Sequence, residues 1–319
     1  MTIHADGGGD DRRADGPATL ATDRVLQQDA AAEPAAQPDP CPACGEPSLL
    51  NYCAACGERR FDPEHLTLRH FARESVAQVS NLDSTFVRSF RSLIARAGEL
   101  SAAYLSGRRK LFLRPLQIFL LCNVTFFFVE GTIGRSNIFS TPLQTHLYGV
   151  PYRTLTQRLV MERTAQRGIT PLEYERSFNA IVERQSKTLV ILMVPIFALL
   201  LGLTYAWSGR PAVTHLVFSM HLYSYFLLVI TALVVITTMK YELLTELGVS
   251  LELVDRHFDR VVTLTVLTVM ACYIALGQRR VYGTGWPATL VRTAVLLVGL
   301  MVSLTLYRLA LFFTSFWLA

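Results

Sequence analysis

Charged residues are scarce in this chain of 319 residues: 17% are Asp, Glu, Lys or Arg, whereas 51% are hydrophobic. This balance excludes an ordinary soluble domain, in which about a quarter of the residues are charged. The first 110 residues lack an apolar run long enough to cross a bilayer, and the first forty lack the apolar core of a cleavable signal. The sequence therefore predicts an all-α polytopic membrane protein whose N-terminal part is not translocated.

The motifs that anchor an enzymatic reaction are missing as well. The chain contains no catalytic acid pair, nucleophile elbow, P-loop or HExxH motif. An enzymatic activity thus has no identifiable nucleophile or base, and the sequence favours a function other than catalysis.

Four of the six cysteines form two CxxCG motifs, and eight residues separate one cysteine pair from the other. This spacing predicts a zinc-ribbon-like site with four thiolate ligands. Structural zinc is the first choice of ion, and iron bound as in rubredoxin is the alternative. Four thiolates leave no open position for a reactive water, and they require a reducing compartment, which places the site on the cytoplasmic side. The predicted metal ligands are Cys41, Cys44, Cys53 and Cys56.

Composition divides the chain into four parts. Residues 1–40 carry eight acidic and three basic residues and few large apolar ones, which predicts a disordered acidic tail. The metal ribbon over 41–58 and a basic juxtamembrane region over 59–110 lead to a transmembrane domain over 111–319. Since the whole chain has a net charge of +5, the tail and the rest have opposite signs, which speaks against a nucleic-acid-binding protein.

The juxtamembrane region contains an amphipathic pattern. Apolar residues recur at helical spacing from Phe86 to Ile94, after a candidate N-cap at Asp83 or Ser84, and Gly98 is a natural stop. Basic residues occupy much of the opposite face, which predicts a helix on a surface of anionic lipid headgroups. The predicted membrane-surface residues are Arg88, Arg91, Arg96, Arg108, Arg109 and Lys110.

Five apolar segments each approach the roughly 20 residues that span a bilayer. The first is the weakest, because Arg114, Pro115 and Gln117 shorten its apolar core, and a re-entrant or interfacial helix is its alternative. A four-span arrangement would place the loop after this segment, which holds eight Lys or Arg, on the cytoplasmic side. The predicted spans are 111–130, 188–207, 213–239, 258–277 and 290–312.

Two local signals predict backbone geometry between the first two spans and within the second. Thr170, Pro171 and Glu173 have the spacing of a capping box, which predicts a helix start. Pro195 lies inside the second span and predicts a kink.

Polar residues inside the apolar spans are candidates for function, because burying them in lipid is costly. Two histidines of the third span lie six residues apart, so their rings point about 120° apart on a helix and do not ligate one metal from the same face. Hydrogen bonds between helices are therefore favoured over chemistry for both. The candidate intramembrane polar residues are Asn123, His215, Ser219 and His221.

Several motifs stand in a distinctive order after the CxxCG pair: Asn81–Phe86, Tyr104–Arg109 before Pro115, His215–His221 and Arg280–Gly283. This succession resembles the bacterial membrane-protein family catalogued as domain of unknown function 3667, over about residue 41 to the end. The resemblance implies a zinc-ribbon-like unit ahead of several helices in the bacterial inner membrane. It implies no established activity.

Two hypotheses for function follow. In the preferred one the protein is a scaffold or adaptor, whose cytoplasmic ribbon recruits an unknown protein partner or a second copy of the chain in a homo-oligomer. In the alternative it is a transporter or channel with a polar path past the third span, and its ribbon is regulatory.

Overall fold

The computed structural model describes residues 39–48, 51–58, 85–133, 139–247 and 251–319. The acidic tail up to residue 38, the first part of the basic region and the predicted N-caps Asp83 and Ser84 lie outside the described residues. Within the described part the fold is helical, apart from two short antiparallel strands in the cysteine segment, β1 (Asp39–Pro40) and β2 (Pro47–Ser48). The predicted all-α membrane fold with a small N-terminal cysteine unit is confirmed.

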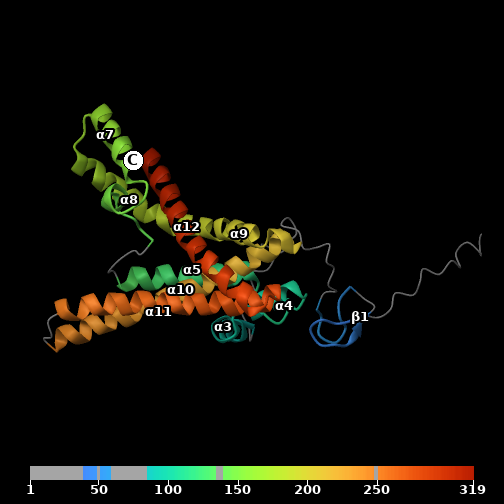
Figure 1. The fold of residues 1–319 in the computed structure, drawn as a ribbon. Coiled ribbons are helices and arrows are strands. Elements are labelled where there is room, and N and C mark those ends of the chain that lie inside the picture. Colours follow the sequence, from blue (N-terminus) through green and yellow to red (C-terminus); the bar gives the residue numbers. More distant parts are fainter. Residues whose placement is uncertain (1–38, 49–50, 59–84, 134–138, 248–250) are drawn as a thin grey trace, which may run out of the picture.

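Among the described residues, two short helices precede the first membrane helix, and two further helices lie between it and the helix with which the second span begins (Figure 1). The short helices are α3 (Thr85–Ala95) and α4 (Glu99–Leu105). The membrane helices and the intervening ones are α5 (Pro115–Ile133), α6 (Leu143–Tyr148), α7 (Arg153–Arg167), α8 (Pro171–Leu189), α9 (Met193–Thr204), α10 (Ala212–Glu246), α11 (Leu251–Tyr282) and α12 (Trp286–Leu318).

Five helices of the described chain are long and apolar enough to cross a membrane, in agreement with the five predicted spans. The first helix begins at Pro115 and not at residue 111, because proline is favoured at the first helical position. The second span is the continuation of α8 into α9 and ends at Thr204, three residues earlier than predicted. Large apolar side chains are exposed along all five helices, as a lipid-facing surface requires, for example Val124, Leu199, Ile236, Leu264 and Val298.

The helices α5 and α10 pack side by side and run in the same direction (Figure 1). Near the start of α10, His221 contacts Ser101 of α4, which precedes α5. Further along both helices, the ring of Phe139 lies 5.2 Å from that of Phe126 and 6.5 Å from that of Phe226. Since the 19 residues of α5 form a continuous helix that packs beside α10 and is long and apolar enough to cross a membrane, the structure favours five crossings over a re-entrant first helix. The cysteine unit and the end of α12 then lie at opposite ends of the bundle.

Both local signals before and within the second span are confirmed. The Thr170 Oγ1 accepts a hydrogen bond from the Glu173 N–H at 3.3 Å, and the Thr170 N–H donates to Glu173 Oε2 at 2.9 Å. Between α8 and α9 the helix tightens into a 3₁₀ turn over Val190–Leu192. This break directly precedes the turn that holds Pro195, because the proline ring displaces the carbonyl four residues earlier and donates no hydrogen bond.

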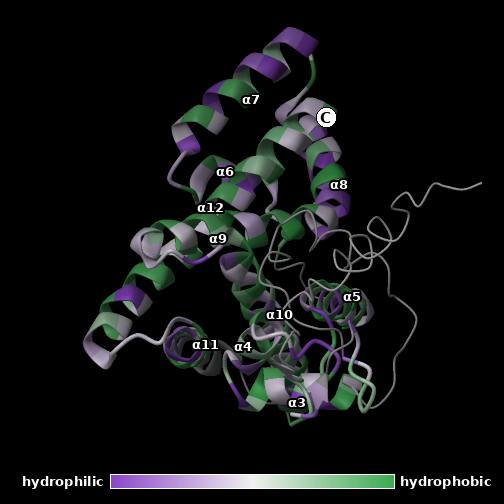
Figure 2. Cartoon of the chain, turned by 90° about the vertical axis from the view of Figure 1, so that its right-hand side faces the viewer, coloured by the Kyte–Doolittle hydropathy of each residue, from purple (hydrophilic) through white to green (hydrophobic). Residues whose placement is uncertain are grey.

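The helices α6, α7 and α8 pack with the C-terminal part of α12 into a lobe that projects from the bundle (Figure 1). We call this unit the α7–α8 lobe. Its core contains aromatic rings in contact, among them Phe178 and Phe312, whose centroids lie 5.8 Å apart and whose planes are tilted by 44°. Hydrophilic and hydrophobic residues alternate along α7 (Figure 2), which is typical of a helix that is half in contact with water.

Candidate metal centre and intramembrane polar contacts

Each CxxCG motif forms the same tight turn. The Cys41 N–H donates to the Glu46 carbonyl at 2.9 Å, and the Gly45 N–H donates to the Cys41 carbonyl at 2.8 Å. The turn that begins at Cys53 repeats both hydrogen bonds at 2.7 Å. The glycine after each motif has a positive φ, +83° at Gly45 and +68° at Gly57, which side chains with a Cβ rarely adopt. We call residues 41–46 the first knuckle and residues 53–58 the second knuckle.

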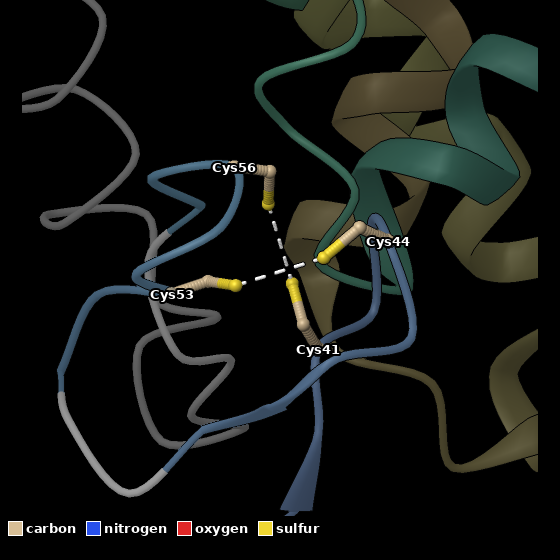
Figure 3. A group of neighbouring side chains, drawn as sticks. All are labelled: Cys41, Cys44, Cys53 and Cys56. Atoms are coloured by element: carbon tan, nitrogen blue, oxygen red, sulfur yellow. Dashed lines mark hydrogen bonds between the residues drawn. The ribbon is translucent and has the colours of Figure 1, made fainter.

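The two knuckles bring four sulfur atoms together around one point (Figure 3). All four Sγ atoms lie within 4.8 Å of one another, and the Cys41–Cys56 and Cys44–Cys53 pairs are each 3.6 Å apart. These distances are far longer than the roughly 2.05 Å of a disulfide. A tetrahedral ion with metal–sulfur bonds of about 2.3 Å would set the sulfurs about 3.8 Å apart. The geometry therefore fits a four-thiolate metal site, as predicted.

Backbone amides favour the thiolate form of Cys53, whereas at Cys44 the lowering effect of the Glu46 N–H is outweighed by hydrogen bonds with neighbouring sulfurs, which raise the pKa of Cys44 to about 12. The N–H of Cys56 has the largest effect on the Cys53 thiol and, together with the N–H of Ala55, lowers its pKa to about 7 against the opposing effect of burial. A lower pKa favours the deprotonated sulfur that binds metal.

The second knuckle is held against the loop that leads into α5. The Lys110 N–H donates to Glu58 Oε2 at 2.8 Å, and the Lys110 ammonium donates to the Cys56 carbonyl. Glu58 is buried, with only 5% of its surface exposed. Lys110 was predicted as a membrane-surface residue, and the structure directs its side chain to the knuckle. Sequence reasoning missed Glu58 as a contact residue, although an acid directly after the second motif was a visible signal.

The helix α3 has the predicted amphipathic character. Leu93 is buried against the bundle, whereas the apolar Val87 and Ile94 are exposed beside Arg88 and Arg91. This exposed mixture of apolar and basic groups is typical of a helix that lies on a lipid surface.

The remaining predicted surface residues contact the protein. Arg96 pairs with Glu99 at 3.2 Å, and Arg108 Nε donates to Ser106 Oγ at 3.4 Å. The Arg109 guanidinium lies 4.8 Å from the centre of the Tyr104 ring. These contacts fix the orientation of the basic residues 108–110, which follow α4 and include the Lys110 that contacts the ribbon.

The two histidines of α10 face different helices. His215 Nδ1 lies 2.8 Å from the Tyr282 hydroxyl of α11, and His221 Nδ1 lies 2.8 Å from Ser101 Oγ of α4. Both hydrogen bonds connect helices, as their angular separation on α10 predicted, and the structure does not bring the two rings together. Ser219 Oγ donates to the His215 carbonyl within α10 at 2.8 Å, and Asn123 is half-buried on α5.

A second polar cluster at the same end of the bundle was missed by sequence reasoning. Gln278 is fully buried, accepts from the Tyr205 hydroxyl at 2.7 Å and donates to Thr293 Oγ1 at 2.6 Å. The Tyr205 ring stacks on Tyr282 with 3.9 Å between centroids. Gln278 directly follows the predicted end of the fourth span. In the sequence, a polar residue at that position indicates the end of a membrane helix, so its burial was not expected.

The α7–α8 lobe contains a buried histidine that gives a pH-dependence prediction. His146 is fully buried between the rings of Phe178 and Phe312, and its Nδ1 lies 3.2 Å from the Tyr152 hydroxyl. Burial, and to a smaller extent the charge of Arg308, lowers the pKa of His146 to about 4. The folded lobe thus binds fewer protons than the unfolded chain, and its stability is present above about pH 6.5 and lost as the pH falls toward 4.

We expect acidification from pH 7 to pH 4 to reduce the free energy of unfolding by about 3 kcal/mol through His146 alone. The variant His146→Phe keeps a ring of similar shape and cannot take up a proton. The thermal unfolding of the detergent-purified variant should therefore depend less on pH by that amount. An identical pH dependence in the two proteins would show that this histidine does not titrate.

Comparison with known proteins gives one partial match. A family model described as "Protein of unknown function (DUF3667)" matches residues 83–127, which include α3, α4 and most of α5. No curated protein and no solved structure shows a significant similarity. Over this stretch, which includes Lys110, the chain is similar to that family.

Proposed function

We propose that this protein is a membrane-anchored scaffold whose ribbon, folded around a structural zinc ion, recruits a protein partner in the cytoplasm. The observation that carries the proposal is the difference between the two knuckles. Lys110 holds the second knuckle against the membrane domain through Glu58 and Cys56. Cys44, Gly45 and Glu46 of the first knuckle are exposed, as are Ala54, Ala55 and Gly57 of the second. A rigid turn that is exposed on one side and anchored on the other suits recognition of another protein.

The choice of zinc and of the cytoplasmic side rests on chemistry. Four thiolates close a tetrahedral coordination sphere, and such a site needs a compartment in which thiols stay reduced. The ribbon lies at the end of the bundle where Arg108, Arg109 and Lys110 precede α5, and basic residues beside a span favour the cytoplasmic side. With the family resemblance, this supports the bacterial inner membrane, with the N-terminal part of the chain in the cytoplasm.

Transport receives less support from the same contacts. His215 and His221 bond to α11 and α4 respectively, so each has a structural partner in a different direction. A polar path would need their free faces to line one route through the bundle.

A photo-crosslinking amino acid at position 46 tests the recruitment. In native membranes we expect it to capture one protein reproducibly. The same amino acid in place of Ser208, which is exposed between α9 and α10 at the same end of the bundle, should not. Deletion of residues 41–57, or the double variant Cys41→Ser/Cys44→Ser, should reduce the capture at least tenfold. If the metal-free variant captures the same protein equally well, or if position 46 captures none, the proposal is wrong.

A further inference from the structure

The helix α3 exposes apolar side chains on the side that faces away from the bundle. Val87 and Ile94 are 69% and 59% exposed, whereas the buried side carries Leu93 and two serines, Ser89 and Ser92. Both serine hydroxyls donate hydrogen bonds within the protein, at 2.7 and 3.2 Å. A helix whose outer side faces water exposes polar residues there, so the exposed apolar pair indicates contact with a further apolar phase or partner.

Two hydrogen bonds fix α3 at the level where the membrane helices end. Ser89 Oγ accepts from the Leu113 N–H at 2.8 Å, and Leu113 lies two residues before Pro115, the first residue of α5. Just beyond the other end of α3, the Arg280 guanidinium donates to the Ala97 carbonyl at 3.0 Å, two residues before α11 ends. Since α5 and α11 are both candidate spans, α3 lies at the boundary of the apolar part of the bundle.

The axis of α3 runs across the axes of the membrane helices. In Figure 1, α5 and α11 extend across the view and α3 is seen end-on, whereas Figure 2 shows α5 and α11 end-on and α3 across the view. A helix with this orientation lies along the membrane surface. Trp207, in the turn after α9, and Trp286, the first residue of α12, are exposed at the same end of the bundle, as is typical of aromatic residues at headgroup level.

The charge on the exposed side of α3 is positive. The helix contains Arg88 and Arg91, which are both exposed, and no acidic residue. Arg91 lies one turn after Val87 and therefore beside the apolar pair. The described part of the chain gives neither arginine an ion-pair partner, whereas Arg96 pairs with Glu99. Arginines that border an exposed apolar pair are complementary to anionic headgroups above acyl chains.

We propose that α3 binds anionic lipid headgroups, with Val87 and Ile94 inserted at the acyl boundary and Arg88 and Arg91 on the lipid phosphates. Of the six basic residues that the sequence predicts on a lipid surface, these two remain available for it. A lipid surface is favoured over a second copy of the chain, because a symmetric contact between two α3 helices would bring their arginines together. The site is independent of the proposed recruitment by the ribbon, since it needs neither the metal nor a protein partner.

Photo-crosslinking of the full chain in lipid nanodiscs tests the site. The nanodiscs contain equal amounts of phosphatidylglycerol and phosphatidylcholine with the same acyl chains, and a diazirine amino acid replaces Val87. Mass spectrometry should detect lipid adducts in which phosphatidylglycerol exceeds phosphatidylcholine about threefold or more, because each arginine near the surface attracts anionic lipid. The double variant Arg88→Gln/Arg91→Gln should return the ratio to about one, as should salt at about 0.5 M, which screens the charges.

Two controls accompany the experiment. Arg96→Gln is the matched variant, since Arg96 is exposed directly after α3 and pairs with Glu99, and its ratio should stay within about 1.5-fold of that of wild type. The same diazirine amino acid in place of Val298, an exposed residue within α12, should capture both lipids in the bulk ratio in every variant.

Three results would overturn the proposal. Position 87 could capture no lipid while position 298 does, or it could capture a second copy of the chain in place of lipid. Capture of both lipids in the bulk ratio at position 87 would show that the arginines recognise no anion. An equal fall of the ratio in Arg96→Gln and in the double variant would mean that only the net charge of this region matters and that α3 forms no site.

Discussion

Replacement of Cys41 and Cys44 by serine is expected to remove the metal from the protein and to unfold the ribbon while the membrane bundle stays folded. The ribbon has two strands of two residues each and no apolar core of its own among the described residues. A unit this small folds only with an added cross-link such as a metal ion. The binding of a structural zinc ion contributes about 10 to 16 kcal/mol to the folding free energy of such a unit. Both knuckles share the ion, so removal of two ligands from the first also releases the second.

Elemental analysis of the purified protein measures the first effect, from about one ion per chain to none. Limited proteolysis measures the second, because a released ribbon is cleaved between residues 39 and 58. Cys272→Ser is the control, since Cys272 is an exposed thiol of α11 that lies outside the cluster. The metal site is refuted if wild-type protein purified under reducing conditions contains neither zinc nor iron.

Substitution of Gly98 by alanine is expected to destabilise the bundle strongly. Gly98 has a φ of +75°, and a Cβ at this position would lie 2.7 Å from the Gly277 Cα and 2.8 Å from its carbonyl oxygen. The obstacle is backbone and cannot rotate away, so α4 and α11 must separate. We expect a loss of about 3 kcal/mol or more in the free energy of unfolding.

The variant Gly168→Ala separates the two causes of that loss, which are the overlap of the new Cβ with Gly277 and the cost of a positive φ. Gly168 has a similar φ of +64°, and a Cβ there would meet no atom within 4 Å. It should lose only about 1 kcal/mol, the cost of a left-handed backbone for a residue with a side chain. Unfolding of both variants in the same detergent gives the comparison. Equal losses would mean that α4 and α11 are not in close contact.

The close approach at Gly98 belongs to a continuous series of contacts from the ribbon to the bundle. The second knuckle contacts Lys110, the preceding helix α4 contacts α10 through Ser101 and His221, and Arg280 of α11 donates to the Ala97 carbonyl at 3.0 Å. The ribbon is therefore oriented by the membrane domain. In the proposed scaffold this orientation would present the first knuckle to a partner.

Features that depend on residues close in sequence were predictable. The capping box at Thr170 and the break before Pro195 involve neighbours within about four residues, and the structure contains both. The four cysteine ligands were predictable because each knuckle is a local turn with its own hydrogen bonds. The different directions of His215 and His221, about 120° apart on the helix, followed from helix geometry alone.

Contacts between distant residues were not predictable in this way. The bond between Lys110 and Glu58 joins residues 52 positions apart, and that between His221 and Ser101 joins residues 120 positions apart. The buried Gln278 and the unsatisfied Tyr174 have side chains that are common at helix ends and surfaces, so their burial depends on which helices enclose them.

By itself, the sequence determined the helical membrane class, the number of apolar spans and the four sulfur ligands, because hydrophobic length, helical period and turn chemistry are properties of short segments. Only the tertiary structure decided which knuckle is anchored, which helices the histidines join and where polar atoms lack partners. These depend on how the helices pack, and packing is set by the shapes and hydrogen bonds of side chains that lie far apart along the chain.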